Sequence, residues 1–183
     1  CLLLIIFECI YCDYHLFKER RSLKLTVVIP CRNEQPFIKE CIDAIYNCAL
    51  PSACQMQVFV VDGMSDDGTR AVVTELCQHY PSLHLIDNKQ QLTPFAFNLG
   101  IHAGGEADYV QIVGARHILS SNYLSSCLTK LQENSSIWGV GGQIQNVSVN
   151  EVGACISAVL SSSFGVGMGN FRTMTASGFT DTV

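Results

Sequence analysis

Two polar segments in the first half of the chain contain residue types that can do chemistry. One reads Pro30-Cys31-Arg32-Asn33-Glu34, and the other reads Asp62-Gly63-Met64-Ser65-Asp66-Asp67. A carboxylate such as that of Asp62 accepts hydrogen bonds from a nucleobase imide or a ribose hydroxyl, and a guanidinium such as that of Arg32 neutralises phosphate. The two segments therefore predict a site for a nucleotide.

The same aspartates have a simpler interpretation. Asp66 and Asp67 directly precede Gly68-Thr69, where a helix is expected to begin, and aspartate often caps a helix. Capping stays an alternative for both residues, and also for Asp62. No phosphate loop, no G-x-G-x-x-G and no G-x-S-x-G is present, so the usual signatures of nucleotide hydrolases, dehydrogenases and α/β hydrolases are missing.

Each polar segment follows a short apolar run that is typical of a buried strand, at 25–29 and at 58–61. We expect Pro30 to end the first strand, because proline cannot donate to a sheet ladder. Ligands of open α/β sheets bind beyond the carboxyl ends of the parallel strands. The two segments should therefore lie in one crevice.

Strands and helices alternate through the rest of the chain. Apolar residues recur at helical spacing after each of the two strands, and Gly104 and Gly105 are expected to end a later helix. Further strands are predicted at 83–86, 109–113 and 138–145, and further helices at 94–102, 122–131 and 151–160. This alternation predicts an α/β fold with a mostly parallel, Rossmann-like sheet flanked by helices on both faces. A loop is expected at 161–169.

Composition excludes some classes of function. With 48% hydrophobic and 15% charged residues in 183, a globular domain with a real core is expected. The net charge of −5 and the scattered lysines and arginines argue against nucleic-acid binding. The ten cysteines show no disulfide-framework spacing, so we predict reduced, mostly buried thiols. Cys9, Cys12 and His15 lack the second ligand pair of a zinc site.

Residues 1–22 differ from the rest. Their apolar run is interrupted by Glu8, Asp13 and His15 and is shorter than the ~20 residues of a membrane-spanning helix. We interpret 1–22 as an apolar and basic extension, either a clipped membrane segment or a peripheral anchor. Residues 23–183 are interpreted as one α/β domain.

The polar segments and their strands carry a family resemblance. Residues 27–34 (VVIPCRNE) and 60–69 (VVDGMSDDGT) resemble the opening motifs of family 2 glycosyltransferases with the GT-A fold. A further likeness, to the succinoglycan type of exopolysaccharide biosynthesis, lies in 98–101, 109–124, 140–142, 164–167 and Phe171-Arg172. The likeness extends over roughly 25–183, and it implies that 23–183 form a nucleotide-sugar-binding GT-A domain that is truncated on its C-terminal side.

The resemblance implies a hexosyltransferase that takes its sugar from a nucleotide diphosphate donor, with a UDP-sugar favoured. The acceptor would be a saccharide or a lipid-linked saccharide, the anomeric carbon would be inverted, and the enzyme would work at the cytoplasmic face of the membrane. The donor-site residues that it implies are Pro30, Arg32 and Glu34 near the nucleotide, Asp62 on the base and Asp66 on the ribose side, with Asn98 from the matching segment 98–101. Arg116 is added to this predicted site because of its position after the fourth strand.

One family feature is missing. The family usually has an acidic motif after the fourth strand that holds a divalent cation, Mg²⁺ or Mn²⁺, but here Gly114-Ala115-Arg116 stands there, followed by His117. Glycine has no side-chain oxygen to offer such an ion. Arg116 could instead place positive charge against the diphosphate, or it is an ordinary surface arginine.

No residue is assigned as the base that would deprotonate the acceptor. The family's catalytic base lies in a motif beyond Asp181, the last acidic residue, so no base is assigned. The alternative to an active transferase is therefore a catalytically inactive fragment that binds nucleotide sugar or serves as a scaffold.

Overall fold

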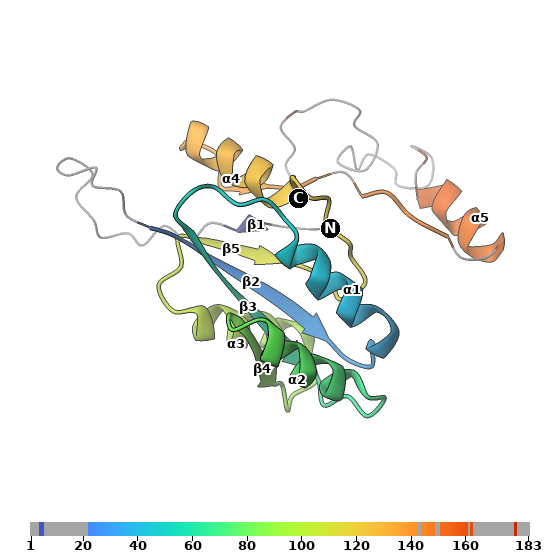
Figure 1. The fold of residues 1–183 in the computed structure, drawn as a ribbon. Helices are drawn as coiled ribbons and strands as arrows, with labels where there is room; N and C mark the ends of the chain where they lie inside the picture. Colours follow the sequence, from blue (N-terminus) through green and yellow to red (C-terminus); the bar gives the residue numbers. More distant parts are fainter. Residues whose placement is uncertain are drawn as a thin grey trace. The chain divides into compact units, whose positions relative to one another are not determined.

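The computed structural model describes residues 4–5, 22–142, 144–148, 151–160, 162 and 178 (Figure 1). Residues Leu2–Val140 form one compact unit, and Gly141–Val183 form a second together with Cys1. The first unit contains the sheet and four of the described helices. In the second unit the described residues include the helix α5 (Glu151–Leu160), at the expected position.

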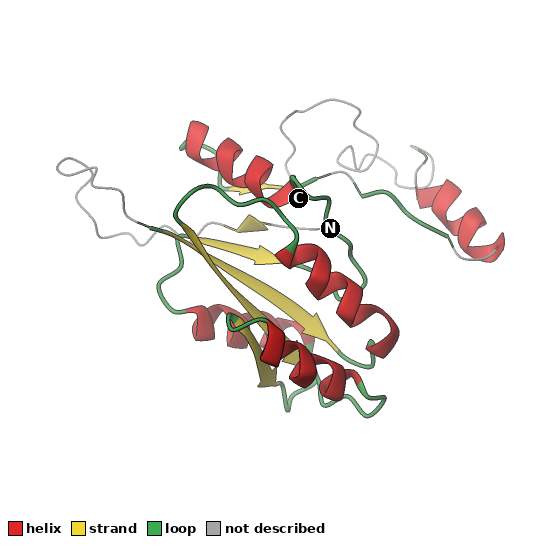
Figure 2. Ribbon diagram, in the orientation of Figure 1, coloured by secondary structure: helices red, strands yellow, loops and turns green. Residues whose placement is uncertain are grey.

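The sheet of the first unit has the strand order β4-β3-β2-β5-β1-β6 (Figure 2). Strand β2 pairs in parallel with β3 and with β5, and β3 pairs in parallel with β4. Strand β1 is antiparallel to both β5 and β6. The mostly parallel sheet expected from the sequence is confirmed. The strands are β1 (Leu4–Ile5), β2 (Leu23–Cys31), β3 (Cys54–Asp62), β4 (Leu83–Asp87), β5 (Tyr109–Ile112) and β6 (Gly139–Val140).

Helices cover both faces of the sheet, as predicted. Their bounds are α1 (Gln35–Tyr46), α2 (Thr69–His79), α3 (Thr93–Gly104) and α4 (Tyr123–Glu133). Alternate residues of β2 point to opposite faces: Val27 and Ile29 pack with the apolar sides of α1, α2 and α4, whereas Val28 packs with Ala96 of α3. All three β2 side chains are fully buried, and each such burial contributes about 1.5–3 kcal/mol.

Helix α3 lies unusually close to the sheet, and glycine makes this approach possible. A Cβ atom at Gly100 would lie 2.4 Å from Cγ1 of Val28, and one at Gly104 would lie 2.3 Å from Oγ1 of Thr26. The helix ends at Gly104, and Gly105 follows with a φ of 61°, as the sequence predicts. The amino end of α3 is thereby held beside the carboxyl ends of the strands.

Two expectations about strand ends are wrong. Pro30 does not end β2, which continues to Cys31 and pairs Pro30 with Val61. The carbonyl of Val28 points toward β5 and accepts a hydrogen bond from the N–H of Val113. The backbone groups of every second residue in a strand point to the same side, so the backbone nitrogen of Pro30 also points toward β5. Because β5 ends at Ile112, the missing N–H of Pro30 costs no hydrogen bond between the two strands. The strand predicted at 138–145 is reduced to Gly139–Val140, because glycine weakens strands.

The described part of the N-terminal extension is Leu4–Ile5, which pairs with β5 and β6, and Ser22. The interpretation of the remaining residues of 1–22 falls outside the described residues and stays a prediction. Most of the loop expected at 161–169 lies outside them as well, as do Phe171 and Arg172. Among the described helices, none combines the length and the apolar character needed to cross a membrane.

Candidate functional site

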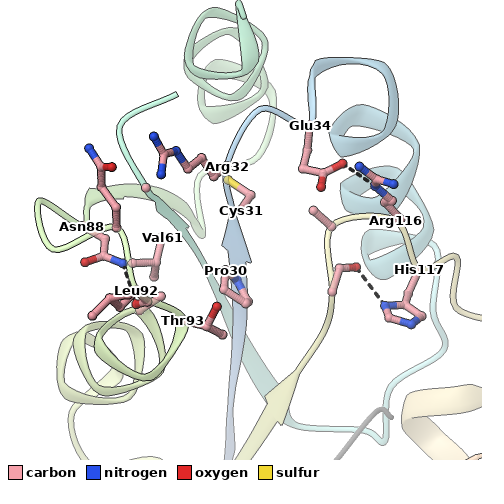
Figure 3. Close-up of a pocket in the computed structure, with 15 residues that line it drawn as sticks. Pro30, Cys31, Arg32, Glu34, Val61, Asn88, Leu92, Thr93, Arg116 and His117 are labelled. Carbon is pink, nitrogen blue, oxygen red and sulfur yellow. Dashed lines mark hydrogen bonds and ion pairs between the residues drawn. The ribbon is translucent and has the colours of Figure 1, made fainter. Parts of the chain in front are cut away.

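A pocket of about 410 Å³ lies at the carboxyl ends of the parallel strands (Figure 3). The loops that follow β2, β3, β4 and β5 contribute to its wall, together with the amino end of α3. This is the crevice that the positions of the two polar segments predict. The lining residues are Pro30, Cys31, Arg32, Glu34, Val61, Gly63, Asn88, Gln91, Leu92, Thr93, Ala96, Gly114, Ala115, Arg116 and His117.

The structure places four of the seven predicted donor-site residues in this lining: Pro30, Arg32, Glu34 and Arg116. The other three do not line the pocket. Asp62 is completely buried, whereas Asp66 and Asn98 are exposed. The ligand roles of all seven stay predictions.

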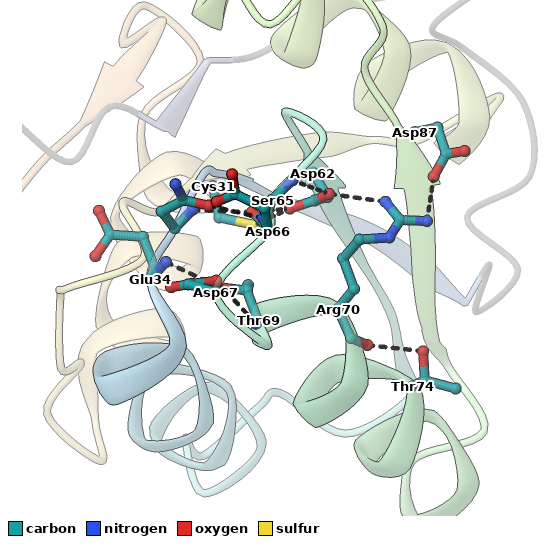
Figure 4. Close-up of polar contacts among 11 residues, drawn as sticks. Cys31, Glu34, Asp62, Ser65, Asp66, Asp67, Thr69, Arg70, Thr74 and Asp87 are labelled. Atoms are coloured by element: carbon teal, nitrogen blue, oxygen red, sulfur yellow. Dashed lines mark hydrogen bonds and ion pairs between the residues drawn. The ribbon is translucent and has the colours of Figure 1, made fainter.

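The carboxylate of Asp62 is saturated with donors from the protein itself (Figure 4). It accepts from the backbone N–H of Ser65 at 3.0 Å, from the hydroxyl of Ser65, and from Nη1 of Arg70 at 2.7 Å. Sγ of Cys31 lies 3.7 Å from its Oδ1. Burial by itself raises the pKa of Asp62, but the bonds from Ser65 and Arg70 outweigh this effect and hold the pKa below its ordinary value. Asp62 is therefore a charged anchor beneath the pocket.

Arg70 joins the ends of two strands. Its Nη2 lies 2.8 Å from Oδ1 of Asp87, which is the parallel partner of Asp62 in the sheet register. One guanidinium thus bridges two adjacent carboxylates. The sequence analysis missed Arg70, although its place one residue after Thr69, in the first turn of α2, was a signal for a side chain near the strand end.

The two polar segments are tied together directly. The backbone N–H of Asn33 donates to Oγ of Ser65 at 2.8 Å, and the N–H of Asp66 donates to Oδ1 of Asn33 at 3.1 Å. Asn33 has a φ of 56°, which asparagine tolerates better than most residues. The loops after β2 and β3 therefore act as one frame for the pocket.

Asp67 binds the first backbone N–H of two helices, although the N-cap positions themselves are Gly68 for α2 and Glu34 for α1. The Asp67 carboxylate accepts from the backbone N–H of Thr69 at 3.0 Å and from that of Gln35 at 3.1 Å, the first residues of α2 and α1. The hydroxyl of Thr69 also donates to it. These bonds, led by the one from the Thr69 hydroxyl, hold the pKa of Asp67 below its ordinary value. Both helix ends are thereby fixed beside the pocket.

An ion pair connects the loop after β5 to the start of α1. Nε of Arg116 donates to Oε2 of Glu34 at 2.7 Å, and Cζ of Arg116 lies 5.0 Å from the centre of the Phe37 ring. The backbone N–H of Glu34 is held in turn by Oγ1 of Thr69 at 2.9 Å. The hydrogen bond to Glu34 raises the pKa of Arg116. Arg116 is thus a cation held at the mouth of the pocket.

Asn88 is a second residue that the sequence analysis missed. Only 2% of it is exposed, its Nδ2 donates to the carbonyl of Leu92 at 2.9 Å, and its backbone N–H donates to the carbonyl of Asp62 at 2.8 Å. Within the described residues its Oδ1 accepts no hydrogen bond. Buried acceptors are seldom left unpaired, but this atom is itself shielded from solvent, so Asn88 contributes to the pocket wall through the two bonds that it donates. Its place directly after β4 was the available signal.

Metal ligands and reactive thiols are scarce here. The described residues contain no group of three or more His, Cys, Asp or Glu side chains that could hold a metal ion. The seven described cysteines are free thiols, of which Cys31, Cys41, Cys48 and Cys127 are buried, as predicted. Burial raises the pKa of Cys41 to about 12, so this thiol is protonated at neutral pH.

Comparison with known proteins identifies similar sequences. The family model described as Glycosyl transferase family 2 matches residues 26–156. Succinoglycan biosynthesis protein ExoA of Rhizobium meliloti is 28% identical over 106 residues, which are 57% of this chain and 32% of that protein. Glycosyltransferase AglE of Haloferax volcanii is 33% identical over 84 residues, or 45% and 27% of the two chains. The matches thus span about a third of these relatives' length.

Solved structures share the fold. The mannosyltransferase PcManGT of Pyrobaculum calidifontis, in complex with GDP-Man and Mn²⁺, superposes with a TM-score of 0.54 and 27% identity, covering 61% of this chain and 33% of that one. TarS of S. aureus, residues 1–349 with UDP, gives a TM-score of 0.51 at 19% identity, covering 61% and 32%. The arrangement is the GT-A fold that the sequence predicts.

Proposed function

Because the chain belongs to glycosyltransferase family 2, we propose that its pocket binds a nucleotide diphosphate sugar and that the protein transfers a hexose from this donor in exopolysaccharide biosynthesis. The acceptor is a saccharide or a lipid-linked saccharide. The observation that carries this proposal is the lining of the pocket at the carboxyl ends of the strands, which includes two arginines, Arg32 and Arg116, and one carboxylate, Glu34, that is paired with Arg116.

The lining supports a place for the diphosphate of the donor. Arg32 and Arg116 are suited to the diphosphate, since guanidinium groups bind phosphate oxygens through paired N–H donors. The two arginines bring positive charge to the pocket, although the chain as a whole has a net charge of −5. Asn88 lies in the lining of the same pocket. The family resemblance favours a UDP-sugar as the donor.

The roles taken from the family resemblance belong to the same proposal. Asp62 supports the base side, Asp66 the ribose side, and Asn98 completes the set on α3. A contact from Asp62 to the base would require one of its present donors, Ser65 or Arg70, to give way. We therefore propose that Asp62 acts chiefly by holding the loop of Ser65 in place.

The reaction that we propose is a displacement at the anomeric carbon. The acceptor oxygen forms a bond to that carbon, the bond from the carbon to the diphosphate oxygen breaks, and the nucleoside diphosphate leaves with the electron pair. Attack from the opposite face inverts the carbon, and a general base takes the acceptor proton. Activated sugars are cytoplasmic, so a lipid-linked acceptor would hold the protein at the cytoplasmic face of the membrane.

Titration with a panel of nucleotide sugars tests donor binding. We expect saturable binding in calorimetry, with UDP-sugars tighter than GDP-sugars, and competition by the matching nucleoside diphosphate. The control is the sugar 1-phosphate without a nucleoside, which should bind much more weakly. If no nucleotide sugar binds saturably, the proposed donor site is wrong.

A second candidate function is favoured by Gly114, which stands where the family's metal-binding aspartate is expected. In that case the protein binds nucleotide sugar without transferring it. Release of free sugar from a bound donor separates the two functions, because transferases slowly pass the sugar to water. Binding without any hydrolysis or transfer, in a protein whose melting curve is cooperative, would favour the binding module.

A further inference from the structure

The imidazole of His117 stands at the place where the family's aspartate is expected. A Cβ atom at Gly114 would lie 2.5 Å from Nδ1 of His117 and 2.7 Å from its Cε1. The imidazole therefore occupies the space in which a side chain at position 114 would begin, and it would have to turn away to admit one. His117 is held there by the Gly114 carbonyl, which accepts from the His117 backbone N–H at 2.9 Å and lies 3.2 Å from Nδ1.

The residues present do not fit a divalent cation. Mg²⁺ and Mn²⁺ bind mainly to carboxylate, carbonyl and water oxygens. Glu34 is the only carboxylate in the pocket lining, and it is paired with Arg116. A cation placed beside Glu34 would have to displace a guanidinium that already neutralises it at 2.7 Å.

Arg116 is placed to supply positive charge to the phosphate oxygens instead. Glu34 engages only its Nε–H in the hydrogen bond observed, which leaves the terminal N–H groups of the guanidinium available for phosphate oxygens. The Phe37 ring supports the flat face of the cation at 5.0 Å. The side chain is 66% exposed, so a ligand in the pocket can reach it.

We infer that this pocket binds the diphosphate of its donor without a divalent cation, and that Arg116, positioned by Glu34 and Phe37, carries the charge that a metal ion would otherwise supply. This inference rests on the proposed function, because it assumes a nucleoside diphosphate in the pocket. Glu34 is a positioning residue in this arrangement, and the imidazole of His117 keeps the aspartate's place filled.

Calorimetric titration of the full chain with UDP, and in parallel with GDP, tests the inference. Each titration is performed in excess EDTA and again in EDTA-free buffer with MnCl₂. We expect the Kd for the nucleotide to change by less than about twofold between the two buffers. In EDTA, Arg116→Gln should weaken binding by about tenfold or more, the loss expected for a charge-assisted hydrogen bond, and Arg116→Lys should recover part of it.

Lys130→Gln is the matched control, since it removes the same unit charge from an exposed position on α4 outside the pocket lining. It should leave the Kd unchanged. Melting curves check that each variant folds. We expect the Arg116 variants to fold because this side chain is exposed.

Two results would overturn the inference while leaving the proposed function intact: nucleotide binding that EDTA weakens at least tenfold and MnCl₂ restores, or an Arg116→Gln variant that binds as tightly as the parent chain in EDTA. Failure of both nucleotides to bind in either buffer would instead refute the proposed function, and the inference with it.

Discussion

Arg70 donates to the fully buried carboxylate of Asp62 at 2.7 Å, across the junction between α2 and the end of β3. The same guanidinium reaches Asp87 at the end of β4. The floor of the pocket therefore depends on a charge pair whose acidic member has no access to water. Removing the arginine would leave that charge poorly compensated.

We expect Arg70→Gln to lower the free energy of unfolding by about 2 kcal/mol in urea titrations. A fully buried pair loses about 3–5 kcal/mol when one partner is removed, but the Arg70 side chain is 36% exposed, so water compensates part of the loss. The control is Lys39→Gln, which breaks the exposed pair with Asp43 and should cost about 0.5 kcal/mol or less. Equal losses in the two variants would contradict the importance of the Arg70–Asp62 pair.

The same pair predicts a dependence of stability on pH. The pKa of Asp62 is lowered by folding, so at low pH the unfolded chain binds a proton that the folded chain does not. The stabilisation is present above the ordinary carboxyl pKa of about 3.9 and is lost as the pH falls through the lower folded value. The stability difference between the parent chain and Asp62→Asn should therefore be largest near neutral pH and shrink in acid. Asp66→Asn, at an exposed position of the same loop, is the control. A difference that stays constant or grows in acid would argue against this prediction.

The close approach of α3 to the sheet predicts that Gly100→Ala is destabilising. The added Cβ would lie 2.4 Å from a methyl group of Val28, and overpacking of this kind costs about 1–3 kcal/mol. Thermal or urea unfolding measures the loss. His102→Ala, at an exposed position of the same helix, should change stability by about 0.5 kcal/mol or less.

A double variant tests whether the Gly100 contact is the cause. Val28→Ala removes the methyl groups in question, so Gly100→Ala combined with it should cost less than the sum of the two single changes. Additive losses would indicate that Gly100→Ala acts elsewhere.

Asn88 predicts a change in ligand affinity. Asn88→Leu keeps a side chain of similar size but removes the Nδ2 donor that holds the carbonyl of Leu92 in the pocket wall at 2.9 Å, so we expect the affinity for UDP to fall about tenfold, the size of one lost hydrogen bond. Calorimetry measures the change. Asn98→Leu is the informative comparison, because the family resemblance places Asn98 in the donor site whereas the structure places it outside the pocket lining. A loss confined to Asn98→Leu would favour the assignment from the resemblance.

The sequence by itself determined the architecture. Runs of β-branched residues alternating with helical apolar spacing required a mostly parallel sheet with helices on both faces, because both patterns are local and a parallel sheet needs helical crossovers. The same reasoning placed the polar segments after β2 and β3 in one crevice, since the ends of adjacent parallel strands meet at one edge. Pro30, Arg32, Glu34 and Arg116 were identified in this way or through the resemblance, and all four line the pocket.

Only the tertiary structure decided which polar groups are available to a ligand. Asp62 was the most prominent carboxylate in the sequence, yet Ser65 and Arg70 saturate it, while Asn88, which the sequence does not distinguish, is buried in the pocket wall and holds the carbonyl of Leu92. The physical reason is that hydrogen-bond partners and burial depend on contacts between distant segments. Glu34 and Arg116 are 82 residues apart, and neither the pair nor the imidazole that fills the space at Gly114 follows from a local pattern.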